Sequence, residues 1–384
     1  MSSNTCDFVS AHRSVYTRMK QDRGFKHISC LDGVRGLAVL AVFFHHAVNT
    51  SISGTDWPAY VRIIANFVVE GRLGVDLFFV LSGYLITTLL LKDRRKPSLY
   101  HDFYIKRAFR ILPALFASLA FGYLAGYLNG ATVILGLLFV SNYAHLFHIP
   151  TLGPFWSLAV EEQFYIIWPV LVRRASFRAF HRIVLGIILI EPIIRYVSVQ
   201  HGHGTMYYTW VRADGLAWGA WLGASTYYHR IYADARRADV WWNRYGRWVG
   251  AVGLVAVTSY FLSLDLNWIT VQRDTALFTM SPILFTGLLS YLITHPRAAI
   301  ARLLSTRPLA FFGDISYGLY LVHLTVINLI DGHTDWLDRP IEPLPYVVRL
   351  IVIFGISVGT SALSLYLFER PVMRLRSRYL TRRL

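Results

Sequence analysis

The chain of 384 residues is strongly apolar: 55% of its residues are hydrophobic, only 16% are charged, and its mean hydropathy is +0.43. A soluble domain of this length cannot bury so much apolar surface in a single core, so the composition indicates an integral membrane protein. The formal net charge of +16 does not indicate nucleic-acid binding, because the basic residues lie between apolar runs, as the positive-inside rule predicts for cytoplasmic loops.

The N-terminal residues 1–26 are polar and lack the apolar core and cleavage site of a signal peptide, so they are predicted to form a cytoplasmic tail. The membrane domain is predicted to occupy residues 27–374, followed by a basic cytoplasmic tail, 375–384. The two cysteines, Cys6 and Cys30, exclude a disulfide scaffold. Both precede the first apolar run, so they are expected to be reduced thiols.

Apolar runs long enough to cross a bilayer predict an all-α polytopic protein with about ten membrane helices. The predicted spans are 31–49, 73–91, 109–128, 155–172, 183–199, 208–228, 248–264, 276–294, 311–330 and 346–368. An eleventh run, 131–148, would invert every later loop if it crossed the membrane, so it is predicted to be a re-entrant or interfacial segment. With ten spans, every basic cluster and both termini lie in the cytoplasm, which predicts a multi-pass protein of the cytoplasmic (inner) membrane.

The first span carries ionisable residues on one face. His46 follows Arg35 by eleven positions, which is three helical turns or about 16 Å, whereas His45 points about 100° away. One interpretation is that Arg35 extends to the interface and the histidines bond a neighbouring helix. Two adjacent histidines inside a span nevertheless favour a functional role, and we expect His46 to act as a general base.

The second span begins with Arg72 and Asp76, which are four residues apart and are predicted to pair across one turn. This spacing fits a structural ion pair at least as well as a catalytic role. Arg212 and Asp214 lie near the outer end of the sixth span and are further candidates for substrate contact, because buried charge in a membrane is costly.

The third span begins with a basic cluster, Lys106, Arg107 and Arg110. These residues could extend to the lipid interface. Arg107 and Arg110 are three residues apart on one helix face, which equally suits a grip on the phosphates of a cytoplasmic cofactor.

The fourth span contains Ser157, Glu161 and Glu162 among aromatic residues. Two adjacent carboxylates in a membrane helix have no inexpensive structural explanation. Glu162 is expected at a depth comparable to that of His46, so the sequence predicts that this carboxylate orients the imidazole.

The ninth span holds Tyr317 and His323 at helical spacing. A single histidine in the middle of a span is more often a packing residue than a catalytic one, so both are second-rank candidates.

Seven segments in a fixed order, spread over residues 28–374, resemble the acyltransferase-3 family of membrane O-acyltransferases. They are LDGVRGLAVLAVFFHH, GVDLFFVLSGYLI, FYIKRAFRILPAL, FWSLAVEEQFYIIWPVL, RADGLAWG, ISYGLYLVH and FERPVMR. The resemblance implies about ten membrane helices, an acyl-CoA donor on the cytoplasmic side, and transfer of an acetyl or other short acyl group to a hydroxyl, often of a sugar.

The resemblance also implies roles for individual residues. The family's basic residue and histidine, separated by ten residues, fall on Arg35 and His46. Its Arg-x-x-Arg motif falls on Arg107 and Arg110. The glutamate of its Trp-Ser-Leu-x-x-Glu segment falls on one of two neighbouring residues, Glu161 or Glu162. Many members carry an additional C-terminal esterase-like domain, which is not expected here because the chain ends at Leu384.

Together these features predict an enzyme that transfers a short acyl group from acetyl-CoA or another short acyl-CoA to a carbohydrate-containing acceptor. That acceptor is expected to be a surface polysaccharide or the sugar of a secreted metabolite. The expected partners are therefore membrane lipids, acyl-CoA and the carbohydrate, without nucleic acid or metal, and no oligomeric state follows. The chain has no Gly-x-Ser-x-Gly elbow, so an acyl-serine intermediate has little support.

A transporter that carries an acyl group or glycan across the membrane for a separate transferase is the alternative function, since buried charge in about ten spans also describes transporters. The hydropathy pattern shows no internal repeat, which disfavours this alternative. A non-catalytic scaffold conflicts with the cost of burying so many charges.

Overall fold

The computed structural model describes residues 28–49, 68, 70–149, 153–202, 204, 206–232, 246, 248–255, 257–259, 270–332 and 345–381. Within these ranges every regular element is a helix and no strand occurs, which confirms the predicted all-α fold. The predicted N-terminal tail, 1–26, lies outside the described residues. The predicted C-terminal tail, 375–384, begins inside a helix that continues to Thr381.

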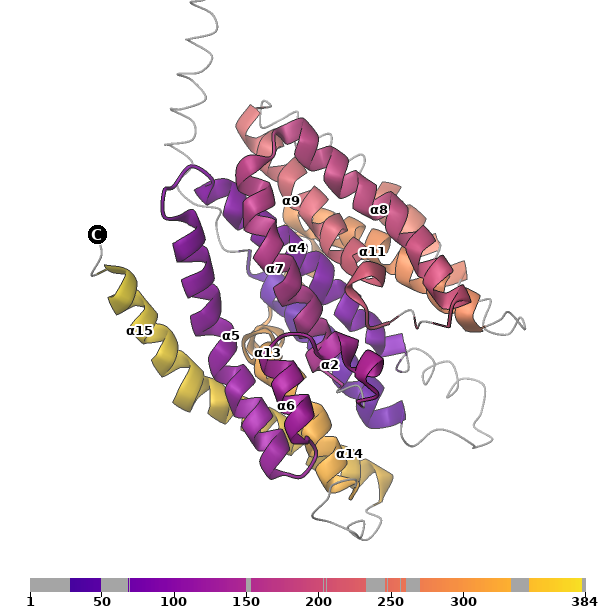
Figure 1. Cartoon of the computed structure of the whole chain (residues 1–384), viewed down its shortest axis with the longest axis vertical. Helices are drawn as coiled ribbons and strands as arrows, with labels where there is room; N and C mark the ends of the chain where they lie inside the picture. Colours follow the sequence, from indigo (N-terminus) through magenta and orange to yellow (C-terminus); the bar gives the residue numbers. More distant parts are fainter. Residues whose placement is uncertain are drawn as a thin grey trace, which may run out of the picture.

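The helices form an elongated bundle (Figure 1). The α-helices are α2 (Cys30–Asn49), α4 (Leu73–Asp93), α5 (Leu99–Leu124), α6 (Gly130–Leu137), α7 (Phe155–Arg174), α8 (Phe177–Gln200), α9 (Ala213–Tyr232), α11 (Thr270–Thr294), α12 (Ala299–Leu304), α13 (Arg307–Ile330), α14 (Tyr346–Leu363) and α15 (Arg370–Thr381). Short turns of 3-10 helix are η1 (Glu70–Arg72), η2 (Ser141–Phe147) and η3 (Thr209–Val211). A π-helical turn, η5 (Ser364–Glu369), joins α14 to α15.

Seven helical stretches in the described part of the chain are long and apolar enough to cross a membrane. They are Cys30–Val48, Glu70–Asp93, Leu99–Leu124, Phe177–Gln200, Asp274–Thr294, Arg307–Ile330 and Tyr346–Arg376. Helices α7 and α9, which were also predicted to span, are richer in polar side chains and are not among the seven. The predicted span 248–264 lies partly outside the described residues. The protein is therefore polytopic, and the count of ten stays a prediction.

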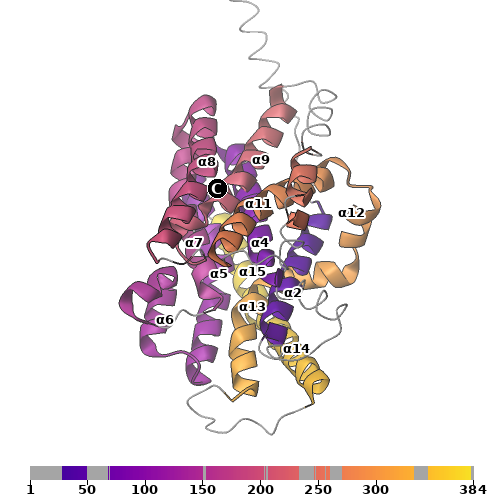
Figure 2. The ribbon, with the colours of Figure 1, turned by 90° about the vertical axis from the view of Figure 1, so that its right-hand side faces the viewer.

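The apolar run 131–148 does not form a continuous span. Helix α6 has 8 residues, or about 12 Å at 1.5 Å per residue, which is far less than the bilayer core of about 30 Å. Phe139 then takes a positive φ of 54° and the chain turns into η2. In Figure 2, α6 lies at the edge of the bundle beside α5. The prediction of a segment that does not cross is confirmed.

Helix α4 lies at the centre of the bundle and α8 at its surface. In α4, 72% of the membrane-crossing stretch is buried, against 22% in α8. Helix α9 packs on α4 through a stripe of glycines, and a Cβ at Gly219 would overlap the backbone of Val80 and Tyr84. The small residues thus permit close helix contact. The exposed side chains Leu189, Ile190 and Ile193 of α8 suit contact with lipid.

One end of the bundle is rich in basic residues. At one end, Arg94 after α4 donates to the Ala175 carbonyl after α7 (2.5 Å), and Ser29 before α2 bonds Ser305 before α13 (3.1 Å). We call this the basic end, because it gathers Lys92, Arg94, Arg95, Lys96, Lys106, Arg107, Arg173, Arg174, Arg178, Arg182, Arg297, Arg302, Arg307, Arg370, Arg374 and Arg376. Such clustering is typical of the cytoplasmic side of a membrane protein.

Candidate active site

A basic cavity of about 400 Å³ lies between α2, α4, α5, α7 and α13. Among the described residues, its charged lining consists of one carboxylate, that of Glu161, and five cations: Arg35, Lys106, Arg107, Arg110 and Arg376. The rest of the wall is mostly apolar, with Phe78, Leu85 and Leu158 among its members. The excess of cations over carboxylates in this lining suits an anionic ligand.

A second cavity of about 640 Å³ adjoins the first at the basic end. The two cavities share several wall residues, including Arg35, Arg110 and Arg376. The second cavity adds two cations, Lys92 and Arg370, and three carboxylates, Asp32, Asp314 and Glu369, to the charged lining. Together the cavities form a basic space that extends from the basic end into the bundle.

Arg107 has a buried donor that faces no protein acceptor. Its guanidinium carbon lies 3.7 Å from the centre of the Tyr165 ring, and the Tyr165 hydroxyl is hydrogen-bonded to Ser82. The Nε of Arg107 is buried without a hydrogen-bond partner among the described residues. Because buried N–H groups are rarely left unpaired, this donor is well placed to bind a ligand atom.

The three arginines that the sequence singled out come together from two helices. Arg35 projects from α2, and Arg107 and Arg110 from α5, into one cavity. Lys106 lines the same cavity. Guanidinium groups match the geometry of phosphate oxygens, so this cluster can hold a phosphorylated ligand.

Glu162 of α7 does not contact His46, the histidine that it was expected to orient, and its neighbour Glu161 faces the basic cavity. Glu161 lines the basic cavity. Glu162 interacts electrostatically with Arg107 and Glu161. Its buried Oε1 has no hydrogen-bond partner in the described part of the chain. No hydrogen bond or ion pair joins Glu162 to His46 among the described residues. The predicted pairing of Glu162 with His46 is therefore wrong, because similar depth in the membrane does not place two side chains on facing sides of their helices.

His46 instead contacts His323 on the parallel helix α13. The Nδ1 of His46 lies 2.9 Å from the Val42 carbonyl oxygen and 3.2 Å from Nε2 of His323. The two ring centres are 5.0 Å apart. His45 occupies another face of α2 and is buried. We call His46 and His323 the histidine pair.

The histidine pair lies directly behind the inner wall of the basic cavity. Tyr320 and Ser157 line that wall, and their hydroxyls are hydrogen-bonded at 2.5 Å. The Tyr320 ring centre lies 5.9 Å from that of His323. Tyr317, one turn earlier on α13, also lines the cavity and donates to the Ile111 carbonyl oxygen (3.2 Å). Tyr320 thus lies between the basic cavity and the His323 ring.

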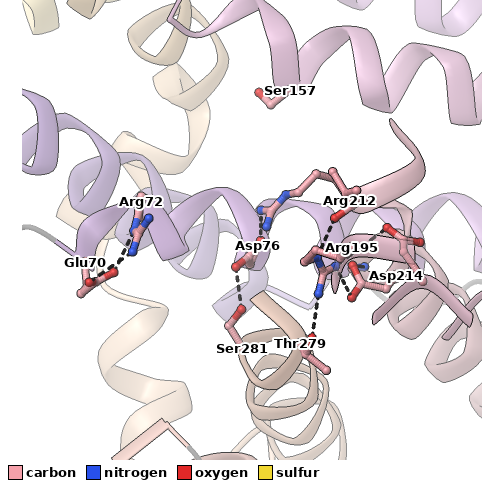
Figure 3. A network of polar contacts seen from close by, with 12 residues as sticks. Glu70, Arg72, Asp76, Ser157, Arg195, Arg212, Asp214, Thr279 and Ser281 are labelled. Atoms are coloured by element: carbon pink, nitrogen blue, oxygen red, sulfur yellow. Dashed lines mark hydrogen bonds and ion pairs between the residues drawn. The ribbon is translucent and has the colours of Figure 1, made fainter. Parts of the chain in front are cut away.

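A separate ion-pair network occupies the other half of the bundle (Figure 3). Arg72 pairs with Glu70 at 2.9 Å and with Asp274 at 2.7 Å, and not with Asp76. Asp76 pairs with Arg212 and accepts from the Ser281 hydroxyl at 2.6 Å. The predicted Arg72–Asp76 pair is wrong, because both side chains find partners on neighbouring helices.

Arg195 of α8 was missed by the sequence analysis. Its side chain is completely buried, donates to Asp214 at 2.6 Å, and also bonds Thr279 at 2.8 Å. Glu191 lies 3.9 Å from it, one turn earlier on α8. A glutamate and an arginine four residues apart within an apolar run are a visible signal of such a group. The network holds α8, α9 and α11 together and places Asp214 in a structural ion pair.

The comparisons with known proteins agree with this architecture. Residues 28–368 match the acyltransferase domain of the acyltransferase-3 family. The chain is 28% identical over 383 residues to the peptidoglycan O-acetyltransferase OatA of Listeria monocytogenes, covering 91% of this chain and 56% of the relative. A putative O-acetyltransferase of Staphylococcus aureus is 28% identical over 377 residues, 88% of this chain and 58% of the relative. A putative peptidoglycan O-acetyltransferase of Bacillus subtilis is 28% identical over 380 residues, 90% of this chain and 55% of the relative.

The chain spans little more than half the length of these curated relatives. No solved structure matches it significantly. The family match covers nearly all of the helical bundle and most of the residues that line the two cavities described above. This multi-pass membrane protein therefore belongs to the acyltransferase-3 family.

Proposed function

We propose that the protein is a membrane O-acyltransferase that moves an acetyl or other short acyl group from acyl-CoA to a hydroxyl of a carbohydrate acceptor. The observation that carries the proposal is the basic cavity, which adjoins the basic end and is lined by Tyr320, whose ring lies next to His323 of the histidine pair. An anion-binding space that leads to an imidazole supplies both requirements of this reaction, a grip on phosphates and a base.

The charged and the apolar parts of the cavity lining match the two ends of coenzyme A. Coenzyme A carries several phosphate charges at one end and a neutral thioester arm at the other. Arg35, Arg107 and Arg110 provide the cations, and the buried Nε of Arg107 provides an unused donor. The apolar wall beyond them, which includes Phe79 and Leu158, suits the arm. We therefore place the phosphates near the basic end and the thioester near Tyr320.

The transfer itself needs a base for the acceptor hydroxyl. In the proposed reaction, His46 takes the hydroxyl proton while the hydroxyl oxygen bonds to the thioester carbonyl carbon. The carbon–sulfur bond then breaks, and coenzyme A leaves as the thiol after it receives the proton from the imidazole. His46 lies in the half of α2 away from the basic end, so an acceptor reaches it from the side opposite the phosphates.

The acceptor class follows from the relatives. Two of them are described as peptidoglycan O-acetyltransferases, one only as putative, and these act or are expected to act on a carbohydrate polymer. We extend the carbohydrate class to this chain, with a surface polysaccharide or the sugar of a secreted metabolite as acceptor. The basic end then faces the cytoplasm, where acyl-CoA is available, and the protein lies in the cytoplasmic membrane with both termini inside.

The test uses the full chain purified into phospholipid nanodiscs, with acetyl-CoA and soluble peptidoglycan fragments. Wild type is expected to release the coenzyme A thiol and to acetylate the fragments, as measured by mass spectrometry. His46→Ala is expected to lower the rate by about 10²–10⁴-fold, the usual contribution of a general base, while acetyl-CoA still binds. The matched control, His45→Ala, changes the adjacent ring and is expected to lose far less. Equal rates for His46→Ala and wild type would exclude His46 as the base.

A further inference from the structure

The hydrogen bonds of the histidine pair fix where its protons lie. The Nδ1 of His323 is 2.7 Å from the Tyr320 carbonyl oxygen and 3.1 Å from that of Leu319. A carbonyl oxygen only accepts, so this Nδ1 carries a proton. In a neutral ring the other nitrogen, Nε2, is then an acceptor, and it faces His46 Nδ1 at 3.2 Å.

His46 also carries its proton on Nδ1. Its Nδ1 lies 2.9 Å from the Val42 carbonyl oxygen, so this nitrogen also carries a proton. That proton is shared between Val42 and Nε2 of His323. The remaining nitrogen of His46, Nε2, then has a free lone pair, and it forms no hydrogen bond with the described residues. The arrangement therefore leaves His46 in the one neutral tautomer that accepts a proton at Nε2.

The two rings are not interchangeable. His323 is 1% exposed, and both of its nitrogens are engaged. His46 is half-buried and keeps one nitrogen unused. An acceptor hydroxyl can therefore meet His46, whereas His323 can act only through His46.

We propose that His323 is a positioning residue, whose Nε2 accepts the Nδ1 proton of His46 and so holds His46 with a bare Nε2 towards the acceptor hydroxyl. This role rests on the proposed function, in which His46 is the base. It is the role that a carboxylate has beside the catalytic histidine of other transferases and hydrolases, and here a neutral imidazole supplies the acceptor. A neutral partner avoids a buried negative charge in the membrane.

Two amide substitutions separate this role from simple packing. The amide oxygen of His323→Gln can take the place of Nε2 and accept from His46. The shorter side chain of His323→Asn reaches only the position of Nδ1 and leaves His46 without that acceptor. With acetyl-CoA and peptidoglycan fragments as probes, His323→Gln is expected to keep kcat within about threefold. His323→Asn is expected to lose on the order of a hundredfold, the usual effect of a misplaced catalytic group, with the KM for acetyl-CoA unchanged.

A double variant and a remote control complete the test. Adding His323→Asn to His46→Ala is expected to cause no further loss, because a positioning residue has no effect once its base is gone. Asn328→Ala, which removes an amide bonded only to the Leu324 carbonyl of the same helix, is expected to behave as wild type.

The outcomes are distinguishable. If wild type and His46→Ala behave as proposed but His323→Asn is as active as wild type, His323 has no positioning role while the proposed function stands. The role is also excluded if His323→Gln is as slow as His323→Asn, or fails to bind acetyl-CoA. An inactive wild type would overturn the proposed function and this role together.

Discussion

Replacing Asp76 by Asn is expected to destabilise the bundle strongly. Asp76 and Arg212 are each 2% exposed and form an ion pair between α4 and the start of α9. The Asn side chain has nearly the same volume but leaves the guanidinium of Arg212 without a counter-ion. Breaking a buried pair by removing one partner typically costs about 3–5 kcal/mol. Arg212 also lies 4.2 Å from the Phe278 ring centre, but that contact is present in both proteins and offsets none of the loss.

The matched control is Asp274→Asn, the same chemical change at a more exposed pair. Asp274 and Arg72 are 22% and 16% exposed, and Arg72 keeps its second partner, Glu70, at 2.9 Å. Exposed ion pairs contribute about 0–1 kcal/mol and broken buried pairs cost about 3–5 kcal/mol. This pair is partly exposed and its arginine keeps a counter-ion, so Asp274→Asn is expected to lose clearly less than Asp76→Asn. The two substitutions thus make the same chemical change at a buried ion pair and at a more exposed one.

Thermal unfolding in detergent, followed by tryptophan fluorescence, measures both effects. Membrane proteins often unfold irreversibly, so the half-life at a fixed temperature should be recorded along with the midpoint. Asp76→Asn is expected to lower the midpoint several times more than Asp274→Asn. Equal shifts, or a larger shift for Asp274→Asn, would refute the assignment of Asp76 and Arg212 as a buried structural pair.

Two further predictions concern the donor and the orientation. Arg110→Lys keeps the charge but loses the guanidinium fork, so acetyl-CoA should bind about tenfold more weakly, as expected for one lost charge-assisted hydrogen bond of about 1.5 kcal/mol. The control Arg349→Lys, which alters the ion pair with Asp331, should leave the affinity for acetyl-CoA unchanged when it is measured by titration. If Arg110→Lys also binds acetyl-CoA with unchanged affinity, Arg110 is not part of the donor site. In a chain whose Cys6 and Cys30 are replaced by Ser, Ser98→Cys at the basic end should react with an impermeant maleimide only after permeabilisation. His201→Cys, after α8, should react in intact cells, and the reverse pattern would invert the orientation.

Helical periodicity explains what could be predicted of the site. Arg107 and Arg110 share a face because they are three residues apart, and the structure places both in one cavity. The charge of the loops was enough to show that 131–148 does not cross the membrane. These features depend only on the local sequence: on the spacing of residues within one helix, or on the charge of a loop.

Contacts between helices could not be predicted in the same way. Arg72 pairs with Asp274, which is 202 residues away, and nothing in a single span shows which helix will be its neighbour. The depth of Glu162 was inferred from its position in the span, but the direction in which it points depends on the packing of α7. His323 was a second-rank candidate because a single histidine in a span is more often a packing residue. Its importance depends on the parallel packing of α13 against α2.

That parallel packing has a consequence for how the protein is made. His46 and His323 are 277 residues apart in the chain, and α2 emerges from the ribosome long before α13. Until α13 is inserted, the face of α2 that carries His46 has no final partner, and lipid or a temporary helix must cover it. The imidazole contact therefore cannot form until α13 has entered the membrane. Synthesis that stalls before α13 would leave a membrane-inserted bundle without its histidine pair. The histidine pair therefore forms only in a protein in which most of the chain has been inserted.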